Sequence, residues 1–118
     1  AMEPDQLKQV TLLLVDDETE FRNTLAKRLQ KRGLNPLHAP DGETCLAILA
    51  KHPVDVVVMD VKMPGMTGLE LQQRLVSTDP GLPVILITAH ASERSRQQAL
   101  AAGASAFLNK PFEDRELL

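Results

Sequence analysis

Five polar side chains follow short, largely apolar runs along the 118-residue chain, where buried strands would end. Three are the acids Asp16, Asp17 and Asp60, and the others are the hydroxyl of Thr88 and the amine of Lys110. The runs before them are 12–15, 54–59, 84–87 and 106–109. Because the carboxyl ends of parallel strands meet at one edge of an open sheet, we expect the five side chains to share one crevice.

Such a set is suited to phosphoryl transfer. Three carboxylates in one crevice repel one another, and oxygen ligands of this kind hold Mg²⁺, with waters completing the octahedron that this ion prefers. The Lys110 amine and the Thr88 hydroxyl are each suited to a phosphoryl oxygen. A carboxylate can itself attack phosphorus to give an acyl phosphate. Asp60 stands alone at its strand end and is the candidate nucleophile, whereas Asp16 and Asp17 are the candidate metal pair.

Length and composition indicate one domain, which we expect at 11–118 after an N-terminal extension at 1–10. Ala1, which precedes a methionine, indicates a cloning scar. A formal net charge of -3 disfavours binding of nucleic acid or an anionic membrane by this segment, because phosphate groups reward clustered Lys and Arg. Cys45 is the single cysteine, and no run approaches the roughly 18 apolar residues of a spanning helix. These features predict a cytoplasmic protein.

Strand-like runs alternate with helix-like periodic stretches, which predicts a parallel sheet covered by helices on both faces. Right-handed crossovers favour an α/β fold with a flavodoxin-like, doubly wound, five-stranded parallel sheet of order 2-1-3-4-5. The fourth helix, beginning near Ser92, carries almost nothing apolar before Ala99, so it should be easy to shift. A fifth helix is expected from Phe112, and we expect it to be truncated at the end of the chain.

Two spacings predict helix starts. Asp17 and Glu20 have the spacing of a capping pair for the first helix. Thr67 and Glu70 have the same spacing at the start of the third. In a capping pair of this kind, the first side chain accepts a hydrogen bond from an otherwise unpaired N–H of the first helical turn.

Taken together, the motifs resemble the receiver domain of two-component response regulators, over about 11–118. The matching pieces are Asp16-Asp17, Asp60 followed by Met63-Pro64-Gly65, Thr88-Ala89, Gly103-Ala104 and Lys110-Pro111-Phe112. An acidic pair alone would be a weak signal, because acids commonly cap helices. The order and spacing of the whole set make the resemblance specific.

The resemblance implies phosphoryl transfer to Asp60 from the phosphohistidine of a sensor histidine kinase or phosphotransfer domain. It implies that Asp17 and Asp60 bind Mg²⁺ directly with the backbone carbonyl of Lys62, and that Asp16 acts largely through water. Thr88 and Lys110 would hold the phosphoryl group. Such a domain catalyses its own phosphorylation and slow dephosphorylation, and it is a signalling switch rather than a conventional enzyme.

The resemblance also implies how the signal leaves the site. Thr88 moves toward the phosphoryl group, an aromatic residue turns inward, and the face of the fourth helix, last strand and fifth helix shifts. That face would control an output domain or effector protein and could form a phosphorylation-dependent homodimer. The aromatic residue here is Phe107, where tyrosine is frequent, and without a hydroxyl its ring is expected to lean inward even before phosphorylation. The side chains of Lys62, Ala89 and His90 would tune the access of water.

Other functions are weighed against this one. A haloacid-dehalogenase-type phosphatase needs a second aspartate two residues after the nucleophile, where Lys62 stands. A flavodoxin-type electron carrier would have a hydroxyl- and glycine-rich loop after the first strand, and a dinucleotide-binding domain would have Gly-x-Gly-x-x-Gly there. This chain has Asp16-Asp17-Glu18 at that place, which disfavours both classes. The strongest rival is a pseudo-receiver, an interaction module that keeps the fold without using phosphorylation.

Overall fold

The structure is a computed structural model that describes residues 10–61, 65–88 and 93–109. Its strands are β1 (Thr11–Val15), β2 (Asn35–Ala39), β3 (Val56–Asp60), β4 (Val84–Thr88) and β5 (Ala106–Asn109). Its helices are α2 (Thr19–Lys31), α3 (Gly42–Lys51), α4 (Gly68–Thr78) and α5 (Glu93–Ala101). None of these described helices has the length and apolar character needed to cross a membrane. The helix expected from Phe112 lies outside the described residues.

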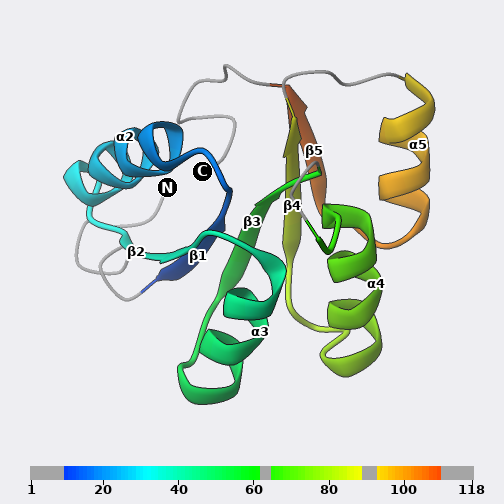
Figure 1. Ribbon diagram of the computed structural model, residues 1–118, viewed down its shortest axis with the longest axis horizontal. Helices are drawn as coiled ribbons and strands as arrows, with labels where there is room; N and C mark the ends of the chain where they lie inside the picture. Colours follow the sequence, from blue (N-terminus) through cyan, green and yellow to red (C-terminus); the bar gives the residue numbers. More distant parts are fainter. Residues whose placement is uncertain (1–9, 62–64, 89–92, 110–118) are drawn as a thin grey trace.

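The five strands form one parallel sheet in the order β2-β1-β3-β4-β5 (Figure 1). This confirms the predicted flavodoxin-like, doubly wound fold. The chain first moves outward from β1 to β2 and then crosses back over β1 to β3. The order therefore reverses between β1 and β3, and ligands of such folds bind beyond the carboxyl ends of the strands at this point.

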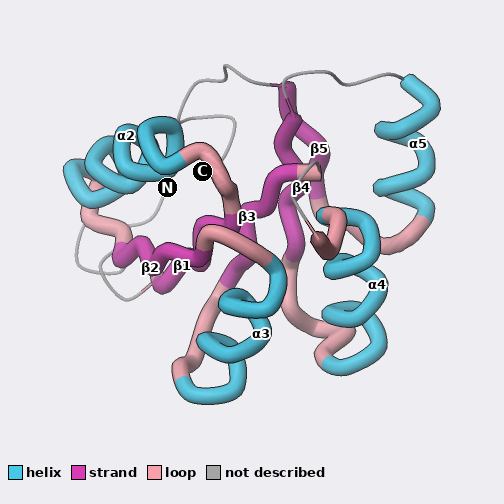
Figure 2. The backbone as a smooth tube through the Cα atoms, in the orientation of Figure 1, coloured by secondary structure: helices cyan, strands magenta, loops and turns pink. Residues whose placement is uncertain are grey.

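Alternating side chains of the strands build a core on each face of the sheet. On one face, Leu13 of β1 belongs to the same buried cluster as Leu71 of α4. On the other, Leu14 of β1 joins a cluster with Leu29 of α2. Figure 2 shows α2 on one side of the sheet and α3, α4 and α5 on the other. The prediction of helices on both faces is thus confirmed, and strands buried on both sides explain the nearly continuous apolar runs in the sequence.

One of the two predicted capping pairs is confirmed. The Glu70 N–H donates to Thr67 Oγ1 at 3.2 Å, and the Thr67 hydroxyl donates to Glu70 Oε1 at 3.3 Å. The pairing of Asp17 with Glu20 is wrong, because the N-cap of α2 is Glu18, one residue later, and its side chain makes no capping hydrogen bond. Continuity with β1 holds the two aspartates at the edge of the sheet, so the chain turns into the helix only after them.

Helix α5 is weakly anchored, as its sequence predicts. Ala99 is its buried residue among the side chains described there, and Leu100 is 38% exposed. The amide Nε2 of Gln72, a fully buried residue of α4, donates to the Ala99 carbonyl at 3.0 Å. Little buried apolar surface is the condition under which a helix moves easily. Whether α5 does so stays a prediction.

Cys45 should be chemically inert in the folded chain. It lies in α3 with 0% of its surface exposed, and burial raises the pKa of its thiol to about 12. Because the thiolate is the reactive form, we expect iodoacetamide at about pH 8 to leave the native chain unmodified. Intact-protein mass spectrometry checks this, with the chain in concentrated urea as the control that should react fully. Equal labelling rates with and without urea would contradict it.

Candidate functional site

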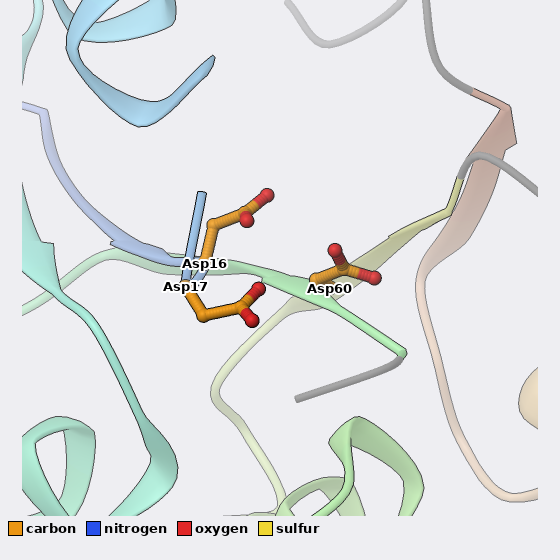
Figure 3. A group of neighbouring side chains, drawn as sticks. All are labelled: Asp16, Asp17 and Asp60. Atoms are coloured by element: carbon orange, nitrogen blue, oxygen red, sulfur yellow. The ribbon is translucent and has the colours of Figure 1, made fainter. Parts of the chain in front are cut away.

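Three acidic side chains converge at the carboxyl ends of β1 and β3. Asp16 and Asp17 follow β1 directly, and Asp60 is the last residue of β3 (Figure 3). One carboxylate oxygen from each lies within 4.8 Å of those from the other two. Asp16 and Asp60 are buried, with 2% and 5% of their surfaces exposed, whereas Asp17 is exposed. Asp17 therefore forms the solvent side of the cluster.

The sheet register brings these acids together. Strands β1 and β3 are neighbours, and Val15 pairs with Met59. The next residue on each strand is an aspartate, so Asp16 and Asp60 lie side by side. No long-range signal in the sequence is needed for this, because two parallel strands that end in the same register must present their following residues together.

Asp16 is held by its backbone and its side chain. Its N–H donates to the Ala39 carbonyl of β2 at 3.1 Å. Its Oδ1 accepts a hydrogen bond from the Glu18 N–H at 2.9 Å. Its carbonyl oxygen accepts a hydrogen bond from Nη1 of Arg22, on α2. The turn that carries Asp16 and Asp17 is therefore tied to both β2 and α2.

Backbone hydrogen bonds hold the chain that follows Asp60. The Val61 N–H donates to the Ile87 carbonyl of β4 at 3.0 Å, and the Gly68 N–H donates to the Val61 carbonyl at 2.8 Å. A Cβ atom placed on Gly68 would lie 2.2 Å from the Asp60 carbonyl oxygen. Gly68 thus lets the start of α4 rest directly on the Asp60–Val61 peptide. This role of Gly68 is not evident from the sequence, because it depends on the packing of α4 against the end of β3.

The donor set of this cluster fits a hard divalent cation. Three carboxylates offer oxygen ligands from two strand ends, and a shared cation would offset their mutual repulsion. Mg²⁺ uses one or two protein carboxylates and keeps several waters, so the exposed side at Asp17 suits it. A cluster with a cation and a carboxylate at a strand end can position a phosphoryl group and attack it.

A sequence model of the response regulator receiver domain matches residues 12–118. The chain belongs to this family. The pseudo-receiver reading is not favoured, because the matching relatives are response regulators. Solved receiver domains share the fold of this chain, and its sheet order agrees with membership of the family.

Two curated relatives and one solved structure show the extent of the similarity. The chain is 38% identical over 109 residues to the probable transcriptional regulatory protein TcrX of Mycobacterium tuberculosis, covering 92% of this chain and 47% of TcrX. It is 43% identical over 107 residues to the transcriptional regulatory protein CpxR of Klebsiella pneumoniae, covering 91% and 45%. The structure of the response regulator TrrA of Thermotoga maritima in complex with Mg(2+)-BeF aligns with a TM-score of 0.83 and 32% identity, covering 92% and 93%. The receiver domain thus spans about half the length of these curated relatives.

Thr88 and Phe107 lie on neighbouring strands of the receiver domain. Thr88 ends β4 and is 4% exposed, and because Asp60 pairs with Ile87, it lies one residue beyond Asp60 at the same edge of the sheet. Phe107 pairs with Leu86 and is 9% exposed, within the core on the α3, α4 and α5 side. Phe107 is therefore buried, and the expected inward lean of its ring before phosphorylation stays a prediction.

Four predicted site residues lie outside the described residues: Lys62, Ala89, His90 and Lys110. Their expected roles in metal binding, in tuning and in holding the phosphoryl group stay predictions. The described residues bring together Asp16, Asp17 and Asp60, with Thr88 on the next strand.

Proposed function

We propose that this receiver domain accepts a phosphoryl group on Asp60 from a phosphohistidine of a sensor histidine kinase or phosphotransfer domain. The observation that carries the proposal is the convergence of three carboxylates, of which Asp60 comes from a strand end of its own. Asp60 is buried beside Asp16, and exposed Asp17 gives the cluster a side that is open to a reaction partner. Such a path suits a small exposed group such as a phosphoimidazole.

Mg²⁺ is the cofactor that we propose for this cluster. Asp17 and Asp60 would bind it directly with the backbone carbonyl of Lys62, and Asp16 would act largely through water. When bound, the ion neutralises charge that develops on the phosphoryl oxygens. Oδ1 of Asp16 accepts a hydrogen bond from the Glu18 N–H, which supports an indirect role for this carboxylate.

The transfer step needs no further nucleophile. One carboxylate oxygen of Asp60 attacks phosphorus, the donor's P–N bond breaks, and the leaving imidazole nitrogen keeps the bonding electron pair and takes a proton from water. The product is an acyl phosphate on Asp60. Thr88 would donate its hydroxyl hydrogen to one phosphoryl oxygen and Lys110 would pair with another. Water later hydrolyses the acyl phosphate, at a rate that Lys62, Ala89 and His90 would tune.

The output would be a shift of α5 and β5. Phosphorylation would draw Thr88 toward the phosphoryl group, and the space that it leaves would favour an inward ring of Phe107, whose place is in the core cluster on the α3, α4 and α5 side. A ligand moves such an equilibrium by its differential affinity for the two states. We propose that the resulting surface controls an output domain or effector protein, or a phosphorylation-dependent homodimer.

Incubation with acetyl phosphate and Mg²⁺, followed by intact-protein mass spectrometry, tests the proposal. We expect the chain to gain the mass of one phosphoryl group. Removing the metal with a chelator should prevent the gain, because the carboxylates of the cluster would then repel the incoming phosphoryl group, which is also an anion. Adding excess Mg²⁺ should restore it. A folded chain that gains no mass, or gains it equally with chelator, would count against the proposal and favour a pseudo-receiver.

A further inference from the structure

Arg22 connects the metal-site turn to two other elements. Its Nη1 donates to the carbonyl oxygen of Asp16, and its Nε donates to Nδ1 of His38 at 3.2 Å. Arg22 lies on α2 and is half-buried, and His38 lies on β2. One guanidinium group therefore joins α2, the turn after β1 and the neighbouring strand. Nδ1 of His38 accepts this bond, so this nitrogen carries no proton. The pKa of His38 is lowered, first by partial burial and second by the positive charge of Arg22.

The bond to Asp16 acts on Asp17. The carbonyl of Asp16 and the N–H of Asp17 belong to one planar peptide unit, so holding the carbonyl fixes the plane from which the Asp17 side chain leaves. Figure 3 shows the side chains of Asp16 and Asp17 diverging from this stretch of chain. The Asp16 N–H and Oδ1 anchor the residue before that plane, and Arg22 sets the rotation of the plane itself.

We propose that Arg22 is a positioning residue for the metal-binding carboxylate of Asp17, and that His38 holds the guanidinium in place. This inference rests on the proposed function, since it assigns Asp17 to Mg²⁺. The side chain of Asp17 is exposed, so surrounding side chains restrict it less than they restrict Asp16 and Asp60. The orientation of its backbone therefore has a larger part in placing its oxygens. Residues that orient metal ligands through a hydrogen bond change metal affinity by about 10- to 100-fold when they are replaced.

The variant Arg22→Lys isolates geometry from charge. Lysine keeps the positive charge but lacks the planar fork that reaches two acceptors at fixed angles. Arg28→Lys, an identical change at an exposed position of the same helix, is the matched control. Isothermal titration calorimetry with MgCl₂, well below the melting temperature, gives the dissociation constant. The phosphorylation rate with acetyl phosphate is then measured against Mg²⁺ concentration.

We expect Arg22→Lys to raise the Mg²⁺ dissociation constant about 10-fold, whereas Arg28→Lys leaves it unchanged. At saturating Mg²⁺ the phosphorylation rate of Arg22→Lys should return to within about twofold of the original, because Asp60 and the acceptor chemistry are intact. A purely structural role for Arg22 would lower the melting temperature without this separation. His38→Leu, which removes the acceptor of Arg22, should raise the dissociation constant by a smaller factor. His38→Asn, whose side-chain oxygen can replace Nδ1, should restore it.

The outcomes separate the two proposals. An unchanged dissociation constant in Arg22→Lys, with the unsubstituted chain binding Mg²⁺, would overturn this inference alone. A rate that stays low at saturating Mg²⁺ would also overturn it, since the defect would then lie in phosphoryl transfer. An unsubstituted chain that binds no Mg²⁺ would overturn the proposed function together with this inference.

Discussion

Asp60→Asn is expected to abolish phosphoryl uptake while the chain stays folded. An asparagine amide has nearly the shape of the carboxylate but is not a nucleophile toward phosphorus, so the acyl phosphate cannot form. Asp60 is 5% exposed, and because the two side chains have nearly the same volume, we expect the buried site to accommodate the change. The measurement is the intact mass after incubation with acetyl phosphate and Mg²⁺. We expect a loss of at least about 100-fold in the initial rate of mass gain.

Two further variants sharpen this prediction. Asp17→Asn should keep the nucleophile, so its phosphorylation should be slow at low Mg²⁺ and partly recover as Mg²⁺ is raised. Glu43→Gln removes an exposed carboxylate of α3 that is not in the cluster, and it should behave like the unsubstituted chain. Mass gain that persists in Asp60→Asn would mean that another residue accepts the phosphoryl group. Mass gain lost equally in Glu43→Gln would point to a general effect of charge.

The grouping of the three acids could be predicted from the sequence because it depends on local rules. A short apolar run that stops at an acid marks a strand end, and parallel strands place their carboxyl ends at one edge. Asp16, Asp17 and Asp60 follow directly from these rules, and so does Thr88 at the end of β4. The burial of Phe107 could also be expected, since a phenylalanine has no polar atom to keep near water.

The supports of the site could not be predicted, because they depend on contacts between distant segments. The role of Arg22 requires the crossing of α2 over the turn after β1, and its bond to His38 requires the pairing of β1 with β2. The failed capping pair has the same cause. Spacing alone favoured Asp17 as a cap, but the sheet holds Asp16 and Asp17 in the site, and α2 starts after them.

Gln72 makes a polar contact that the helical pattern of apolar residues in α4 does not predict. It occupies a core-facing position of α4, and an apolar side chain would be expected there. Its Nε2 donates to the Ala99 carbonyl, while its Oε1 is buried without a hydrogen-bond partner among the described residues. A buried polar atom of this kind is costly, so the contact with α5 is held at the expense of stability. The sequence shows a glutamine but cannot show which helix it reaches.

Gly68→Ala is expected to destabilise the chain strongly and to disturb Asp60. The added Cβ would lie 2.2 Å from the Asp60 carbonyl oxygen, 2.7 Å from Val61 Cα and 3.0 Å from the Asp60 carbonyl carbon. These are backbone atoms at the end of a central strand, so no side chain can rotate away to make room. Either α4 moves off the sheet and weakens the Gly68 N–H bond to Val61, or the Asp60–Val61 peptide is displaced.

Both responses carry a large cost. Overpacking against a rigid core lowers the free energy of unfolding by about 3 kcal/mol, which for a chain of this size corresponds to a fall of roughly 15 °C in melting temperature. Urea unfolding followed by far-ultraviolet circular dichroism measures the first quantity, since the chain contains no tryptophan or tyrosine for fluorescence. In the fraction that stays folded, a misplaced nucleophile should slow phosphoryl uptake by up to about 100-fold.

Gly81→Ala is the matched control for this prediction. The same added Cβ would there meet Asp79 Oδ1 at 3.7 Å, an ordinary contact distance, so its stability should change by less than about 0.5 kcal/mol. If Gly68→Ala were as stable as Gly81→Ala and took up phosphate at the original rate, the close approach of α4 to Asp60 would not matter to the site. If it were unstable but reacted normally when folded, then Gly68 would support the fold without positioning the nucleophile. Loss of both properties is the result expected if the start of α4 sets the position of Asp60.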